Sequence, residues 1–135
     1  MEVKIESKIG QIQNTPERIF NFLSDFNNLK GMVPPNEKVK DFSVTSDSCQ
    51  FTIEGIGKAG LRIIEKEPFT AIKLKSENSP YELNLWLQLK EAAPYDTRTK
   101  ITIKMELNPM LKMMVQKPLQ KFVDELVDRL AMLPY

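Results

Sequence analysis

The sequence predicts an α+β fold in which a curved antiparallel sheet of seven strands wraps around one long C-terminal helix. From residue 39 to residue 107 apolar and polar residues alternate with the period of a β-strand, and short, turn-rich links join the alternating runs. Short links favour hairpins and therefore antiparallel pairing. The segment from Asn108 to Leu133 instead repeats its apolar residues at helical spacing.

A half-buried strand is expected from Val3 to Ile12, because apolar and charged residues alternate along it and Ile9 falls on the apolar face. A short amphipathic helix should follow. Asn14 or Thr15 can cap this helix, and Pro16 suits its first turn because the missing N–H costs nothing there. Its expected apolar stripe comprises Ile19, Phe22, Leu23 and Phe26.

A second short helix is expected from Asp25 to Met32, ended by Gly31 and by Pro34 and Pro35. Six strands should then follow, so that the order of elements is strand, two helices, six strands and a long helix. The strands are expected at Val39–Thr45, Cys49–Ile56, Ala59–Lys66, Thr70–Glu77, Tyr81–Lys90 and Arg98–Leu107.

The two longest strands are apolar on one face only, which indicates a face built to be covered. We expect the final helix to cover it with a stripe of Leu111, Val115, Leu119, Phe122, Leu126 and Leu130. Pro118 interrupts this pattern and has no N–H for the carbonyl of Met114, so a bend or break is expected between Met114 and Lys117. The second half should anchor the helix and the methionine-rich first half should move; a plain curve that follows the sheet is the alternative.

Nineteen basic and eighteen acidic side chains leave a net charge of +1. This balance argues against the charged footprint that nucleic-acid or anionic-membrane binding usually needs. No apolar run reaches the ~20 residues that cross a bilayer, and the first residues do not resemble a signal peptide. We therefore expect one cytoplasmic domain over residues 1–135, without membrane insertion.

The residue types limit the chemistry more than any motif does. The chain has no histidine, the side chain best suited to proton transfer near neutral pH and the commonest metal ligand. Its one cysteine, Cys49, is expected in the core. Glu65 is in phase with the apolar Leu61 and Ile63, but an exposed position is favoured because charged side chains are rarely buried. No catalytic pair, metal cluster or cofactor motif is predicted.

Two surface features have ordinary interpretations. The glycine-rich segment from Glu54 to Gly60 lacks the spacing of a phosphate-binding loop and is typical of a hairpin. Trp86 falls on the polar face of its strand, where it is expected to pack against neighbouring side-chain stems. A solubilising outer face is expected from Arg62, Lys73, Lys75 and Lys104.

In its order of elements the whole chain resembles the START-related helix-grip superfamily (SRPBCC), which includes polyketide cyclases, lipid-transfer domains, pollen-allergen-type proteins and chaperone activators. The most specific similarities are the segment from Thr15 to Asp25, which resembles the first helix of the family, and Asn108-Pro109-Met110 at the start of the last helix. These motifs indicate the fold and not a reaction. The resemblance implies a cavity, closed by the C-terminal helix, that holds a small hydrophobic molecule.

The leading interpretation is therefore a module that binds or transports a small apolar, lipid- or polyketide-like ligand between the sheet and the helix. The predicted cavity lining is Phe51, Leu61, Ile63, Leu74, Leu85, Leu87, Ile103, Met105, Met110, Met114, Val115 and Phe122. For the methionines, an ordinary role in the core is the alternative. Two other functions stay open: an enzyme of the cyclase or dehydratase kind, and a protein-interaction module of the chaperone-activator kind with no ligand.

Overall fold

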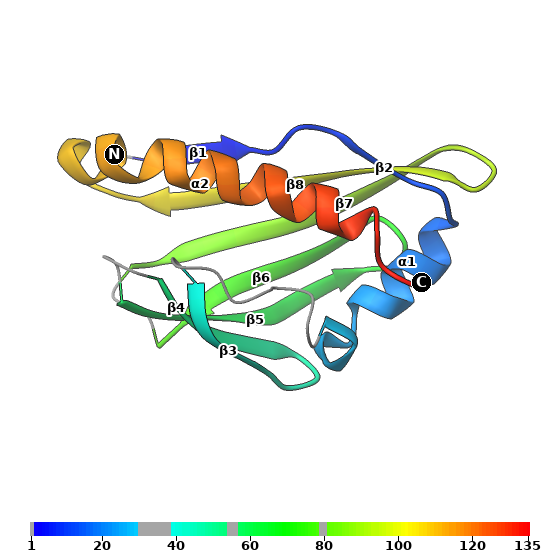
Figure 1. The fold of residues 1–135 in the computed structure, drawn as a ribbon, viewed down its shortest axis with the longest axis horizontal. Coiled ribbons are helices and arrows are strands. Elements are labelled where there is room, and N and C mark those ends of the chain that lie inside the picture. Colours follow the sequence, from blue (N-terminus) through cyan, green and yellow to red (C-terminus); the bar gives the residue numbers. More distant parts are fainter. Residues whose placement is uncertain (1, 30–38, 54–56, 79–80) are drawn as a thin grey trace.

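The computed structural model describes residues 2–29, 39–53, 57–78 and 81–135. One curved antiparallel sheet runs through the molecule in the order β1-β8-β7-β6-β5-β4-β3, and β2 also pairs with β8 (Figure 1). The strands are β1 (Glu2–Glu6), β2 (Gly10–Ile12), β3 (Val39–Val44), β4 (Ser48–Ile53), β5 (Gly57–Glu67), β6 (Ala71–Glu77), β7 (Leu83–Ala93) and β8 (Asp96–Glu106). The predicted α+β fold class is confirmed.

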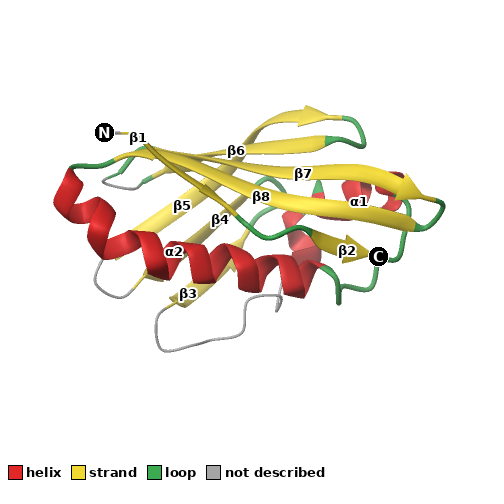
Figure 2. Ribbon diagram, turned by 90° about the horizontal axis from the view of Figure 1, so that it is seen from above, coloured by secondary structure: helices red, strands yellow, loops and turns green. Residues whose placement is uncertain are grey.

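Three helical segments of the described chain complete the fold. They are α1 (Pro16–Leu23), the 3-10 turn η1 (Phe26–Leu29) and α2 (Pro109–Leu130). The long helix α2 crosses one face of the sheet, and α1 packs near the far end of β7 (Figure 2). The element order therefore matches the predicted one, except that the first strand is divided in two.

The prediction of one strand from Val3 to Ile12 is wrong because a β-bulge interrupts it. Glu6 faces Thr102, but Gly10 faces Thr99, so the N-terminal chain carries one more residue than β8 between these pairs. The extra residue reverses which side chains point inward. Ile12 is therefore buried, whereas Ile9 is 68% exposed, opposite to the prediction.

The first helix forms as its sequence predicts. Thr15 is the N-cap, and its Oγ1 accepts a hydrogen bond from the backbone N–H of Arg18 at 3.3 Å. The predicted stripe is buried at Ile19, Leu23 and Phe26, but Phe22 is only half-buried. The second predicted helix is the single turn η1; its expected end at Gly31 and the following prolines lies outside the described residues.

Among the described residues, the outer face of the sheet carries Trp86 among polar side chains. Trp86 lies on it with the ammonium groups of Lys73 and Lys104 at 5.2 and 5.6 Å from the centre of its ring, so the predicted packing against side-chain stems is confirmed. Glu65 is also exposed, because a bulge between Ile63 and Glu65 turns it outward. Residues 54–56 of the predicted glycine-rich hairpin lie outside the described residues.

The helix α2 begins where Asn108 caps it, since the Asn108 side chain accepts a hydrogen bond from the N–H of Leu111 at 2.9 Å. It continues as one helix through Pro118, so of the predicted bend or break the break is wrong, and the first turns are inclined to the rest (Figure 2). The fully buried side chains of α2 are Val123, Val127 and Leu130, all after Pro118.

Polar contacts join the second half of α2 to the bulge. The backbone N–H of Lys8 donates to Asp124 at 2.7 Å, and the Lys8 ammonium group lies 2.9 Å from Asp128. The side-chain amide of Gln120 donates to the carbonyl of Glu6 at 2.8 Å. Helix side chains therefore bind backbone groups that the bulge withdraws from the β-ladder.

The packing of β2 against α2 leaves no space for a side chain at Gly10. A Cβ atom there would overlap Cγ1 of Val127, which is completely buried and cannot move aside. Gly10→Ala should lower the free energy of unfolding by about 1–3 kcal/mol, the usual cost of overpacking a core. Urea denaturation measures this change. The matched control is Gln11→Ala on the exposed side of the same strand, and equal stability of the two variants would contradict this account of the contact.

Candidate functional site

An apolar cavity of about 90 Å³ lies between the concave face of the sheet and the second half of α2. Side chains from both helices, η1 and six strands surround it. Among the described residues, its lining comprises Leu23, Phe26, Leu29, Phe42, Cys49, Phe51, Leu61, Leu74, Leu85, Leu87, Ile101, Phe122, Leu126 and Leu130. All of these side chains are hydrocarbons except the thiol of Cys49.

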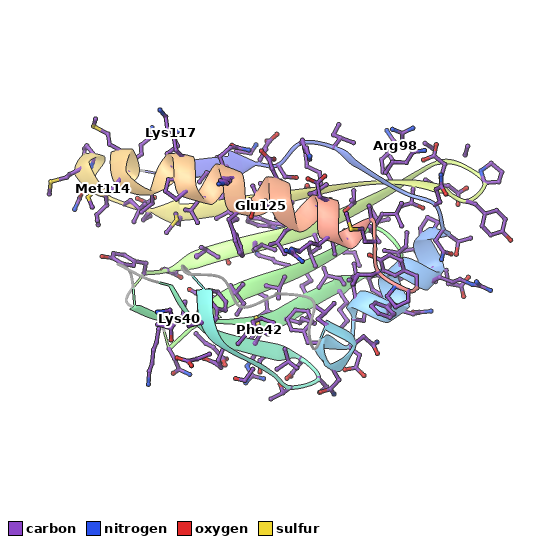
Figure 3. All side chains as sticks on the ribbon, viewed as in Figure 1. Lys40, Phe42, Arg98, Met114, Lys117 and Glu125 are labelled. Atoms are coloured by element: carbon purple, nitrogen blue, oxygen red, sulfur yellow. The ribbon has the colours of Figure 1, made fainter. Side chains whose placement is uncertain are left out.

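The position of α2 explains why this space exists. The helix packs against β1, β2 and β8, which lie at one end of the strand order, and the sheet then curves away toward β3, β4 and β5 (Figure 1). The helix is therefore close to one half of the sheet and farther from the other. Phe122 and Leu126 reach from α2 toward this space, and Phe42 and Phe51 reach it from β3 and β4 (Figure 3 labels Phe42).

The structure brings together half of the predicted lining. Six of the twelve predicted residues border the cavity, and they are Phe51, Leu61, Leu74, Leu85, Leu87 and Phe122. The other six do not border it, and they are Ile63, Ile103, Met105, Met110, Met114 and Val115. Ile103 lies instead in the packed core, and Met110 and Met114 are 68% and 66% exposed. Whether any of the twelve binds a ligand stays a prediction.

Eight further residues line the cavity. Four of them belonged to predicted helical stripes, and their sequence pattern indicated burial without indicating a cavity: Leu23, Phe26, Leu126 and Leu130. Cys49 and Ile101 alternate with other apolar residues on their strands. For Leu29 and Phe42 no local pattern indicates the site, because the tertiary curvature of the sheet alone brings them to it.

Aromatic contacts hold the C-terminal end of α2 in place. The rings of Phe22 and Tyr135 meet edge to face with their centres 5.0 Å apart, and the Tyr135 hydroxyl donates to the carbonyl of Leu130 at 2.6 Å. Burial raises the pKa of the Tyr135 phenol, so this hydroxyl stays protonated and keeps donating. These contacts tie the end of α2 to α1, and both helices contribute to the cavity wall.

The cavity is electrically neutral. Desolvation by burial raises the pKa of the Cys49 thiol to about 11, so at neutral pH this group is a weakly polar, uncharged part of the wall. In the part of the chain that the structure describes, no three carboxylate or thiol side chains are grouped so that they could hold a metal ion. The described lining therefore offers apolar contact to a bound molecule.

No family model matches the sequence, and no curated protein matches it either. Solved structures do match it over nearly its full length. Norcoclaurine synthase from Thalictrum flavum has a TM-score of 0.75 at 10% identity, covering 98% of this chain and 86% of the synthase chain. A START superfamily protein from Mycobacterium smegmatis has a TM-score of 0.64 at 15% identity and covers 98% of both chains.

An uncharacterised protein from Bacillus thuringiensis is a third match, with a TM-score of 0.63, 9% identity, and coverage of 98% of this chain and 99% of that one. At these identities the likeness shows the fold alone. The chain has the helix-grip fold that its sequence resemblance implied. Over the described residues, none of the helices is both long and apolar enough to cross a membrane.

The raised pKa of Cys49 leads to a measurable prediction. Only the thiolate reacts with an alkylating reagent, and a pKa raised from 9.0 to about 11 lowers the thiolate fraction at pH 8 about 100-fold. Iodoacetamide should therefore modify the native protein at least about 100 times more slowly than the urea-unfolded chain. Mass spectrometry of samples quenched over time gives both rates. Similar rates in the two states would show that Cys49 is not buried in the cavity wall.

Proposed function

We propose that this protein binds a small, largely apolar molecule in the cavity between its sheet and the second half of α2. The observation that supports this proposal most strongly is the composition of the wall: residues from separate elements converge on one space, and their side chains are hydrocarbons and one neutral thiol. Such a wall favours burial of apolar surface and gives little directional selection among ligands.

The size of the cavity restricts how a ligand would fit. Sites for drug-sized molecules usually measure about 300–1,000 Å³, and this one measures about 90 Å³. In this conformation it would hold a small hydrophobic molecule or the apolar end of a longer one. A charged or strongly polar group would lose its hydration inside and would therefore stay at the rim. A lipid-like or polyketide-like molecule with one polar end meets these conditions.

The structural neighbours are compatible with such a ligand. Norcoclaurine synthase from Thalictrum flavum has been solved in complex with dopamine and hydroxybenzaldehyde, in a chain that this one matches with a TM-score of 0.68. For this protein, a cyclase or dehydratase activity is supported only by family resemblance. The interaction-module alternative requires a filled core, and the observed cavity favours ligand binding instead.

The first test fills the cavity. Leu61 is half-buried in the wall, and Leu61→Phe should place additional carbon atoms in the empty space. Ile64→Phe is the matched control, because Ile64 is 50% exposed and outside the wall. A fluorescent fatty acid and a panel of aromatic compounds serve as probes.

At a ligand concentration of 100 times Kd, the wild type and Ile64→Phe should gain about 2.7 kcal/mol of stability, or roughly 10 °C in Tm. Leu61→Phe should stay folded and lose most of this shift. If no probe stabilises the wild type, or if Leu61→Phe binds as tightly as the control, this cavity is not the ligand site.

A second test concerns the route of uptake. Pro118 is exposed inside α2 and leaves the carbonyl of Met114 without its helical donor, so the turn before it should open more easily than the rest. Pro118→Ala should restore this bond and raise the free energy of unfolding by up to about 3 kcal/mol. If the first half of α2 opens to admit ligand, stopped-flow fluorescence should show slower association and dissociation with an unchanged Kd. Unchanged rates in a stabilised variant would mean that Pro118 only shapes the helix.

A further inference from the structure

A methionine-rich stripe runs along the first half of α2 on the side away from the sheet. Its members, Met110, Met113, Met114, Lys117 and Lys121, follow one another at i, i+3, i+4, i+7 and i+11. Residues at this spacing share one face of a helix. The residues that pack on the protein lie on the opposite face. We refer to these five residues as the methionine-lysine face.

The methionines of this face are among the most exposed apolar side chains of the described chain. Met110, Met113 and Met114 are 68%, 82% and 66% exposed, and Lys117 and Lys121 are exposed as well. Figure 3 shows sulfur atoms projecting from the free end of α2 and Lys117 pointing away from the sheet. Three neighbouring apolar side chains that contribute nothing to the core form a patch that suits an interaction.

The charge of this part of the helix is positive only. From Leu107 to Val123 the sequence contains three lysines and no carboxylate. The next acids on α2 are Asp124, Glu125 and Asp128; Asp124 and Asp128 are bound to Lys8 at the bulge, and Glu125 is exposed one turn after Lys121. Because the macrodipole favours acids near a helix N-terminus and bases near the C-terminus, lysines placed early in α2 do not serve the stability of the helix.

We propose that the methionine-lysine face docks this protein reversibly on the surface of an anionic phospholipid bilayer. The lysine ammonium groups would contact lipid phosphates and carboxylates, and the methionine side chains would enter the boundary between headgroups and acyl chains. The helix lies flat on the surface in this arrangement and does not span it. Since this face lies outside the cavity, surface docking and ligand binding are separate properties.

Charge complementarity favours a lipid surface over a protein partner. An anionic bilayer has negatively charged headgroups at its surface and an apolar layer directly beneath them. The lysine ammonium groups can contact the headgroups while the methionine side chains enter the apolar layer. The acids near the start of α2, Glu2 and Glu106, face each other on the outer side of the sheet, because Val3 and Met105 point inward between β1 and β8. Both carboxylates belong to the side of the sheet opposite the one covered by the helix. The net charge of +1 for the whole chain conceals this local imbalance.

The test is flotation of the full-length protein with vesicles of phosphatidylcholine alone or mixed with phosphatidylserine. Binding should occur on the mixed vesicles, be weak on neutral ones, and fall as NaCl is raised. Lys117→Gln with Lys121→Gln should weaken partitioning roughly 30-fold, at about fivefold for each lysine. Met113→Ser with Met114→Ser should also weaken binding while leaving the net charge unchanged.

Two matched controls separate this face from general surface properties. Lys58→Gln with Lys90→Gln removes the same charge from other exposed positions, and Met132→Ser removes a methionine that is 79% exposed at the other end of the helix. Both controls should bind like the wild type, and circular dichroism should show all variants folded. Absence of binding to the mixed vesicles, or equal weakening by the controls, would overturn the proposal.

If the methionine-lysine face instead binds a second copy of this chain, the protein should form a dimer through it. Sedimentation velocity would then show a dimer that is lost in Met113→Ser with Met114→Ser, without vesicle binding, and the proposal would again be overturned. A measurement of fatty-acid binding on the same variants should show wild-type affinity, because none of the five residues borders the cavity.

Discussion

The contact between the β-bulge after Ser7 and the second half of α2 determines the arrangement of the rest of the molecule. The bulge removes backbone groups from the ladder with β8, and Asp124 and Gln120 of the helix bind groups of Lys8 and Glu6 in their place. Ser7 completes the junction, since its Oγ accepts a hydrogen bond from the N–H of Ile101 at 2.8 Å. The helix is thereby fixed over β1, β2 and β8, and the space on its other side becomes the cavity.

Because of this attachment, the parts of α2 before and after Pro118 have different roles. After Pro118 the helix supplies completely buried residues and the acids that bind Lys8, so its sequence is constrained on both of these sides. Before Pro118 its inward side chains, such as Leu111 and Val115, are only half-buried. The composition of the first half is therefore less restricted by stability, and exposed methionines and lysines can be present there without weakening the core.

The sequence predicted the elements well because each leaves a local signal: strand alternation, the cap at Thr15, and the start of α2 at Asn108. The bulge between Glu6 and Gly10 leaves no local signal in the sequence, since one extra residue in a strand does not change the composition around it. Only half of the predicted lining residues border the cavity, for a related reason. Periodicity identifies apolar faces, but the tertiary position of α2 decides that Phe122 borders the cavity while Met110 and Met114 remain outside the protein core.

The cavity also has an energetic consequence. At about 24 cal/mol for each Å³, an empty apolar space of about 90 Å³ costs about 2 kcal/mol relative to a filled one. That is a large fraction of the ~5–15 kcal/mol by which a domain is usually stable. Larger side chains at wall positions such as Leu61 or Cys49 could fill the space. They would not alter the hydrogen bonds between α2 and the bulge, which lie on the other side of the helix. The contacts that hold the fold together therefore do not require the cavity, and an apolar molecule bound in it would restore the lost packing energy.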